Sequence, residues 1–183
     1  MSAVIAPFPP SAHERTLNFV LFQAGWFACV LLAARDLAAL GTLAATAVVL
    51  LHILRAPRPA RSAAFIGGVT LVGLLWDSSL PTLGWVSYQS GVLIPGMAPV
   101  WIAALWALFA TTLNSSLAWL QGRPALAALF GALGGPLSYW AGERMGALRL
   151  ESPVAALTQL AVGWAVFMLV LTRTARRAEL GWS

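Results

Sequence analysis

Long apolar runs without a charged residue, separated by short polar or proline-containing breaks, dominate this chain. Residues 101–120 form one run of 20 residues. As a helix rising about 1.5 Å per residue, the run spans roughly 30 Å, which is the thickness of a bilayer's hydrocarbon core. Trp101 and Trp119 lie near its two ends, where tryptophan favours the headgroup level. The pattern therefore predicts a transmembrane helix.

A block of polar residues interrupts this run: Thr111, Thr112, Asn114, Ser115 and Ser116. A helix surrounded by lipid on all sides would not carry such a block, so one face of the helix must turn toward other helices. Serine and threonine can bond to carbonyl groups of their own helix. The amide of Asn114 cannot, and should reach a neighbouring helix. We expect Thr111, Asn114 and Ser115 to make interhelical polar contacts.

The pattern places six apolar segments in all, at 17–34, 37–54, 62–80, 99–120, 125–142 and 154–172. Only two residues separate the first two segments, which predicts a tight helical hairpin. The Pro- and Arg-rich stretch 55–61 predicts a loop. Segment 81–98 is uncharged but rich in Gly and Pro. Because irregular backbone is not tolerated in contact with lipid tails, we expect it to be an interfacial or re-entrant loop packed on the bundle.

These elements predict an all-α, polytopic transmembrane bundle of about six spans over 17–172. A short tail, 1–16, precedes the bundle, and a basic tail, 173–183, follows it. With six spans, eight arginines fall on one side of the membrane and three on the other. The excess of positive charge on the cytoplasmic side then places both termini in the cytoplasm.

Composition supports the membrane class and excludes several others. Hydrophobic residues make up 60% of the 183 residues and charged residues 9%, whereas soluble domains carry about a quarter charged residues. The net charge of +5 comes from arginines and fits membrane topology and contact with anionic lipid. No folded basic face suggests nucleic-acid binding. The single cysteine, Cys29, offers neither a disulfide nor a thiolate metal site within one chain. We expect no metal and no cofactor.

Asp77 is the strongest candidate for a catalytic or ligand-binding residue. It lies about 21 Å along a helix that enters the membrane at Ala63, in the outward third of the bilayer. A carboxylate there is costly, and the dipole of the helix's last turn disfavours it further. Arg144 is the expected partner. Asp77 either fixes helix packing in an ion pair, or acts as a general acid/base or headgroup-binding carboxylate.

Glu143 adjoins Arg144 and is expected at the same depth. Asp77 and Glu143 would then form an acidic pair whose members divide acid and base roles. Glu143 fits a solvated position at the interface equally well. The catalytic candidates are therefore Asp77, Glu143 and Arg144.

Aromatic side chains gather on the same outward side. The set that we expect to bind lipid, together with one serine, consists of Trp76, Ser78, Trp85, Tyr88, Trp101, Tyr139 and Trp140. An ordinary aromatic belt explains most of these residues. The alternative is a pocket with aromatic walls for a lipid headgroup or isoprenoid, with 82–98 as its lid.

Gly131 and Gly135 form a GxxxG step followed by Pro136. Small residues at this spacing allow two helices to approach closely. The step fits packing within the bundle as well as association with a second copy.

The stretch Leu74-Leu75-Trp76-Asp77-Ser78, together with 99–120, resembles the bacterial membrane proteins of domain-of-unknown-function family 2878. The run Phe-Ala-Thr-Thr-Leu-Asn at 109–114 is the most specific part of the likeness. The resemblance implies a multi-pass protein of the bacterial inner membrane with no established activity. It carries over no catalytic residues.

Three functions stay open at this point. The first is an accessory or scaffold protein that acts on or beside membrane lipids, with lipids as partners and other membrane proteins or a second copy as further ones. The second is a membrane-embedded, lipid-modifying enzyme that uses Asp77 and Glu143 at the outer leaflet. The third is a small transporter or channel component with Asp77 and Asn114 lining a path.

Overall fold

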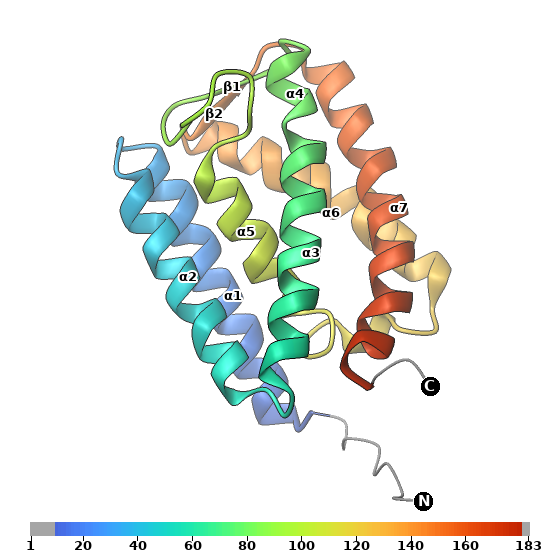
Figure 1. Cartoon of the computed structure of the whole chain (residues 1–183). Coiled ribbons are helices and arrows are strands. Elements are labelled where there is room, and N and C mark those ends of the chain that lie inside the picture. The colour runs from blue at the N-terminus through green and yellow to red at the C-terminus, as the bar shows by residue number, and fades with distance from the viewer. Residues whose placement is uncertain (1–9, 181–183) are drawn as a thin grey trace, which may run out of the picture.

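The structure is a computed structural model that describes residues 10–180, a helical bundle covered at one end by a two-stranded sheet (Figure 1). Its long helices are α1 (Ala12–Ala33), α2 (Ala38–Arg55), α3 (Pro59–Asp77), α6 (Pro124–Arg144) and α7 (Pro153–Leu180). The shorter elements are α4 (Ser79–Thr82), α5 (Val100–Ala110), η1 (Ala118–Leu120), β1 (Val86–Tyr88) and β2 (Leu148–Leu150). The expected all-α class is confirmed, with two three-residue strands added.

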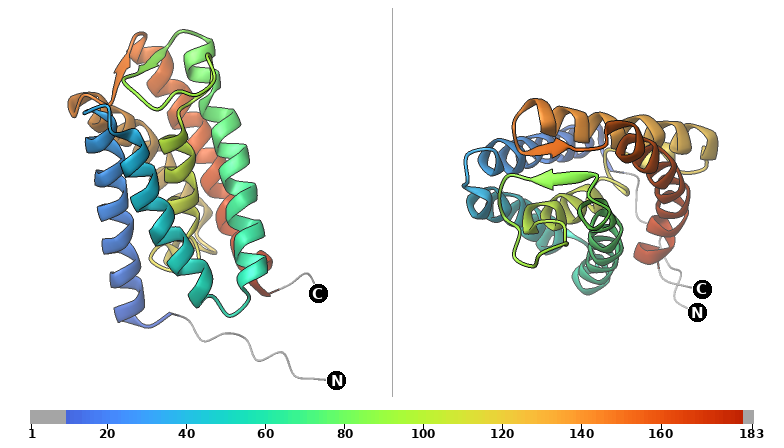
Figure 2. Two further views of the ribbon diagram at one scale, coloured as in Figure 1. Left: turned by 60° about the vertical axis from the view of Figure 1, so that its left-hand side comes forward. Right: turned by 90° about the horizontal axis from the view of Figure 1, so that it is seen from above.

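The bundle has two distinct ends. At the first, which we call the terminal end, α1 begins, α7 ends and α2 turns into α3 (Figure 1). At the opposite end, which we call the sheet end, lie the α1–α2 turn, α4 and the sheet. Helices α6 and α7 pack against each other, and the view from above in Figure 2 shows α6 lying across one side of the bundle.

The expected hairpin of the first two apolar segments is present as α1 and α2. Ser11 and Glu14 cap the start of α1 by exchanging side-chain and backbone hydrogen bonds. Asp36, with φ of 59°, allows the reversal before α2. Gly41 then brings the helices together, because a side-chain carbon at this position would lie 2.8 Å from Cα of Cys29.

Asp77 ends α3, three residues before the predicted end of the third segment. Pro81 explains the difference. It has no N–H to bond the carbonyl of Asp77, so the regular helix stops there and a single turn, α4, continues through Pro81. Asp77 is thereby fixed at the sheet end of the bundle, at the junction of two helices.

The predicted helix over 99–120 is wrong in its second half, because α5 ends at Ala110. Thr111 and Thr112 bond the carbonyls of Leu108 and Phe109 with their side chains, and their backbone N–H groups bond the same two carbonyls. The backbone therefore tightens into successive turns that reach the terminal end. The polar block forms these turns and is not one face of a long helix.

Within residues 10–180, four helical stretches are long and apolar enough to cross a membrane: α1, α2, α3 with α4, and α7 up to Ala175. Helix α5 is apolar, but its 11 residues rise only about 16 Å, roughly half of a bilayer's hydrocarbon core. Helix α6 has the length but lies outside this set. The prediction of six membrane spans therefore stays a prediction.

The segment predicted as a loop, 81–98, covers the sheet end and contains β1, one of the two strands that the pattern missed. β1 pairs antiparallel with β2, with Ser87 opposite Arg149. The rest of the segment is tied to the bundle by hydrogen bonds from the hydroxyl of Ser90 to the carbonyl of Ala33 and from the N–H of Ala98 to the hydroxyl of Ser78. Whether this segment touches lipid remains a prediction.

Candidate ligand-binding site

Asp77 is a charged residue buried in the bundle, with only 1% of its surface exposed. Its Oδ2 accepts a hydrogen bond of 2.8 Å from Nε1 of Trp106 on α5. Its Oδ1 is shut off from solvent and has no well-aligned hydrogen-bond partner among residues 10–180, although the hydroxyl of Tyr139 lies near the carboxylate. A buried polar atom in this condition is rare and calls for an explanation.

The position of Trp106 follows from a glycine on α3. Gly73 lies one helical turn before Asp77, and the indole of Trp106 occupies the place that a side chain would take there. The ring is therefore held flat against α3, with its N–H at the level of the carboxylate. The contact between α3 and α5 thus sets the geometry of the Asp77–Trp106 pair.

A cavity of about 340 Å³ lies beside this pair, between α1 and α5 on one side and α6 and α7 on the other. Its polar lining residues are Gln23, Asp77, Ser138 and Tyr139. The other lining residues are Phe22, Trp26, Ile102, Leu105, Trp106, Phe109, Phe130, Gly131, Gly134, Gly135, Leu137, Ala141, Trp164 and Met168. Asp77 is the only charged residue among them, and the walls are mostly aromatic and aliphatic.

The cavity reaches the outside of the bundle on the α6 side. Phe130 and Leu137 line it, yet 44% and 58% of their surfaces are exposed. Between them lies Gly134, where an added side-chain carbon would meet no atom within 4 Å. In a membrane, this face of the bundle would be covered by lipid tails.

The stacked indole rings of Trp106 and Trp164 pack between α5 and α7 and line the cavity. The rings of Trp106 and Trp164 are parallel, with centroids 4.5 Å apart, and Phe109 meets Trp164 edge to face. Such pairs add to the stability that burial itself provides. The Nε1 of Trp164 is buried and has no hydrogen-bond partner among residues 10–180.

Two tyrosines connect the carboxylate with the sheet end. The hydroxyls of Tyr139, on α6, and Tyr88, on β1, lie 3.3 Å apart. Burial, aided by the nearby Asp77, raises the pKa of the Tyr88 hydroxyl well above its usual value, so this group keeps its proton. Tyr139 lines the cavity with Asp77, whereas Tyr88 faces a polar pocket at the sheet end with Glu143 and Arg149.

The hypothesis that Arg144 pairs with Asp77 is wrong. Arg144 is exposed, and its guanidinium carbon lies 5.4 Å from the ring centroid of Trp140. Glu143 is likewise not part of the Asp77 site. Its carboxylate accepts a 2.8 Å hydrogen bond from the backbone N–H of Leu150 and holds β2. The Asp77 carboxylate takes its hydrogen bond from an indole, which leaves it without an opposite charge.

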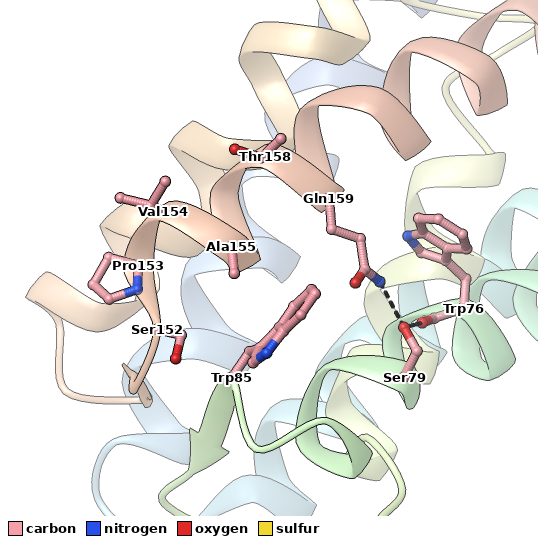
Figure 3. A pocket seen from close by; sticks show the side chains of 9 residues that line it. All are labelled: Trp76, Ser79, Trp85, Ser152, Pro153, Val154, Ala155, Thr158 and Gln159. Carbon is pink, nitrogen blue, oxygen red and sulfur yellow. Dashed lines mark hydrogen bonds between the residues drawn. The ribbon is translucent and has the colours of Figure 1, made fainter.

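Trp76 and Trp85 come together in a separate place. They line a wide surface groove between the α3–α4 junction and the start of α7 (Figure 3). Gln159 of α7 spans this groove by donating a 2.6 Å hydrogen bond to the hydroxyl of Ser79. The groove is an open surface feature that adjoins the bundle, and Asp77 does not line it.

The remaining predicted binding residues have local partners. The hydroxyl of Ser78 bonds the carbonyl of Leu74 and accepts the N–H of Ala98. The indole N–H of the buried Trp101 donates to the carbonyl of Ser90. These bonds tie the 81–98 segment to the bundle.

The polar block holds helix ends together at the terminal end. Asn114 donates to the carbonyl of Ala175 on α7 at 2.9 Å and accepts a bond from Gln121. Thr111 accepts the amide of Asn18 from α1. For Ser115, no interhelical side-chain bond is seen within residues 10–180.

Sequence inspection overlooked the residues that matter most to Asp77. Trp106 and Trp164 lie near the middle of their helices, where a membrane-belt tryptophan is not expected. That central placement is the signal that would have found them. Their meeting across α5 and α7 depends on tertiary packing, which no spacing rule gives.

The fold defines an all-α protein with several helices of membrane-crossing length and a carboxylate enclosed between them. A family model described as a protein of unknown function, DUF2878, matches residues 15–170, and the chain belongs to this family. The resemblance seen in the sequence is thereby confirmed. No curated protein and no solved structure matches the chain.

Proposed function

We propose that this chain is a multi-pass membrane protein that takes one lipid-like molecule from the bilayer into the cavity beside Asp77. It would act as an accessory protein on membrane lipids. The observation that carries the proposal is a mostly apolar cavity of about 340 Å³ whose only charged lining residue is Asp77. Ligand pockets combine such apolar walls with a few polar groups that fix orientation.

The lateral opening supports this proposal. Phe130 and Leu137 are exposed on the side of the bundle and also line the cavity. A molecule that diffuses in the membrane plane would reach the cavity without crossing water. Its polar head would meet Asp77, and its chain would lie against the aromatic walls.

The lipid-modifying enzyme receives less support. Its mechanism needed two carboxylates at one substrate, whereas Asp77 and Glu143 face different pockets. The transport path also lacks support, because Asn114 is bonded to α7 and Gln121. A binding role needs only the single carboxylate and the cavity.

The positive-inside rule assigns the orientation. Eight arginines lie on the segments of the terminal end, and three lie on those of the sheet end. We propose that the terminal end faces the cytoplasm of a bacterium and that the protein lies in the inner membrane. Asp77 and the cavity mouth would then belong to the outer half of the bilayer.

Plugging the cavity tests the binding function. Gly134→Phe places a ring at the cavity wall where there is free space, and Gly68→Phe adds the same ring at an open position on α3. Native mass spectrometry of the protein purified in mild detergent should show a bound lipid in the wild type and in Gly68→Phe, and none in Gly134→Phe. Equal lipid occupancy in all three proteins would reject the proposal.

A further inference from the structure

Two tyrosine hydroxyls extend from the buried carboxyl group of Asp77 to the sheet end. The hydroxyl of Tyr139 lies near the carboxylate, and the hydroxyl of Tyr88 lies 3.3 Å from that of Tyr139. Tyr139 lines the same cavity as Asp77, whereas Tyr88 lines the polar pocket at the sheet end. Only 1% of the surface of Asp77 is exposed, so a proton that reaches it from water must pass through other groups. The two tyrosines connect it with a polar surface pocket.

The sheet-end pocket, of about 360 Å³, is in contact with water. Three of its lining residues, Ser87, Gln89 and Arg149, are exposed. Glu143 adds a carboxylate that can take up and release protons. Tyr88 is partly buried between this pocket and the bundle interior. Its hydroxyl therefore stands between water and the buried hydroxyl of Tyr139.

Packing holds both tyrosine rings in place. Tyr88 lies opposite Leu148 in the sheet, and its ring meets Trp101 edge to face, with centroids 5.8 Å apart. Tyr139 is 5% exposed and follows Gly135 by one helical turn, on the face of α6 that packs against α7. Because the rings are fixed, rotation of the two hydroxyl groups is the main motion that a proton transfer between them requires.

The other walls of the cavity offer no comparable route. Toward the terminal end, the cavity is lined by Phe109 and Met168, which have no exchangeable proton. Its lateral opening is lined by the exposed Phe130 and Leu137, which face lipid in a membrane. Gln23 is polar but is not a titratable residue. The tyrosines thus give the Asp77 carboxyl group access to one end of the bundle.

A proton can move along this path and leave both tyrosines neutral. A hydronium ion in the pocket gives a proton to the oxygen of Tyr88 and becomes water. The hydrogen of Tyr88 passes to the oxygen of Tyr139, and the hydrogen of Tyr139 passes to the carboxylate of Asp77, which becomes a carboxylic acid. Each step breaks one O–H bond and forms another. Burial raises the pKa of the Tyr88 hydroxyl well above its usual value, so the transfers occur together, without a tyrosinate intermediate.

Few other titratable groups lie around Asp77. Within residues 10–180, those that act on it are Tyr139 of α6 and Tyr88 of β1. Helices α1, α5 and α7 present no titratable side chain to the cavity, and α4 contains none. Glu143 and Arg149 lie on the far side of Tyr88, in the sheet-end pocket. The protonation of Asp77 is therefore linked to the pH of that pocket.

We propose that Asp77 exchanges its proton with water at the sheet end through the hydroxyls of Tyr139 and Tyr88. The path ends at the cavity, so it changes the charge of the cavity wall and carries no proton through the bundle. In the orientation proposed above, the pH outside the inner membrane sets this charge. The inference goes beyond the proposed function, because it concerns the Asp77 proton whether or not a lipid is bound.

The kinetics of a pH jump test the path. Trp106 donates to Oδ2 of Asp77, so its fluorescence should change when the carboxylate gains a proton. Stopped-flow acidification of the protein in nanodiscs should show a fluorescence phase in the wild type that is absent from Asp77→Asn. Tyr88→Phe and Tyr139→Phe should each slow this phase at least about tenfold, the rate factor for one lost hydrogen bond. Ser138→Ala, which removes a cavity hydroxyl that bonds its own helix, should leave the rate unchanged.

Blocking the pocket tests where the proton enters. In a background in which Cys29→Ala removes the native thiol, a bulky maleimide attached to Ser87→Cys occupies the sheet-end pocket. This label should slow the same phase severalfold, with both tyrosines intact. The same label on Pro57→Cys, at an exposed position of the terminal end, should leave the rate unchanged.

Each contrary outcome has a definite meaning. If no phase depends on Asp77, the acid does not titrate and the inference is overturned. An unchanged rate in either tyrosine variant, or in labelled Ser87→Cys, overturns it as well. Equal slowing in Ser138→Ala would show that protons move through the cavity and not through the phenols. If Tyr139→Phe does not fold, Tyr88→Phe decides alone. Lipid binding is decided separately by the cavity-plugging variant described above.

Discussion

Asp77 carries two unfavourable energy terms, which its hydrogen bond with Trp106 offsets only in part. The carboxylate is the last residue of α3, where the helix dipole disfavours an anion, and it is buried. A single indole N–H at 2.8 Å satisfies one oxygen. Because the second oxygen has no well-aligned partner within residues 10–180, this bond does not fully offset the desolvation of the acid. This imbalance is why we assign the residue a role in binding rather than in packing alone.

Trp106→Phe should destabilise the protein. The change keeps an aromatic ring but removes the indole N–H that bonds the buried Oδ2 of Asp77, which costs about 1–3 kcal/mol in the free energy of unfolding. Trp140→Phe, at a tryptophan that is 47% exposed, should stay within about 0.5 kcal/mol of the wild type. Denaturant unfolding in detergent, followed by circular dichroism, measures both. Equal stability of the two variants would contradict the assigned role of Trp106.

The need of Asp77 for a partner is predictable from depth and helix position, but the partner itself is not. The sequence shows Arg144 at a matching depth, with the opposite charge. In the structure, Arg144 lies over Trp140 at the surface, and the indole of Trp106 approaches Asp77 across Gly73. Charge and depth can be read along one chain, whereas contact between α3 and α5 requires knowledge of which faces meet.

At the scale of elements, the contact between α6 and α7 depends on glycines. A side-chain carbon at Gly131 would clash with the backbone oxygen of Trp164, and one at Gly135 would clash with the indole ring of Trp164. The GxxxG step therefore packs within the bundle and is covered by α7. Of the two uses that the sequence left open, intramolecular packing is the one that the structure shows.

Gly131→Ala and Gly134→Ala should change stability in opposite directions, although they lie on the same helix. The first introduces a methyl group against the backbone of Trp164 and should cost about 1–3 kcal/mol. The second meets no atom within 4 Å and should gain up to about 1 kcal/mol from helix propensity. Thermal unfolding in detergent distinguishes them. A loss of stability in both variants would show that alanine destabilises α6 for a reason other than contact with α7.

Asn114 connects the turns after α5 with the end of α7. Asn114→Ala removes bonds to the carbonyl of Ala175 and to Gln121, and should lower the free energy of unfolding by about 1–3 kcal/mol. Ser115→Ala, one residue along and without an interhelical side-chain bond within residues 10–180, is the matched control and should have little effect. Proteolysis near the end of α7 should also become faster in Asn114→Ala alone. A similar response of both variants would contradict the connecting role.

The bounds of several elements could be predicted from the sequence, because they depend on local signals. The hairpin follows from the two-residue gap around Asp36, but α3 begins at Pro59, three residues before the predicted segment and inside the predicted loop 55–61. The end of α5 could not be predicted, since the apolar pattern continues past Ala110. Thr111 and Thr112 bend the chain there, and Asn18 from the distant α1 bonds Thr111. Interactions across 93 residues do not appear in a local pattern.

At the scale of the whole molecule, the arginines are distributed unevenly between the two ends of the bundle. The α2–α3 turn, the start of α6 and the end of α7 carry most of the arginines at the terminal end. The sheet end carries three arginines together with the uncharged 81–98 segment. The cavity opens through the side of the bundle, so a lipid ligand and the proposed orientation are compatible.

The orientation is tested with single cysteines, because the chain has one native cysteine, Cys29, which is buried. In a background in which Cys29→Ala removes it, Ser87→Cys places a thiol at the sheet end and Pro57→Cys places one at the terminal end, both at exposed positions. In intact bacterial cells, a maleimide that cannot cross the inner membrane should label Ser87→Cys and spare Pro57→Cys until the cells are lysed. The positive-inside rule gives this direction, because Arg55, Arg58 and Arg61 flank Pro57.

Labelling of Pro57→Cys alone in intact cells would show that the orientation is the reverse of the proposed one and would place Asp77 in the inner half of the bilayer. Equal labelling of both would show that the two ends do not lie on opposite sides of a membrane.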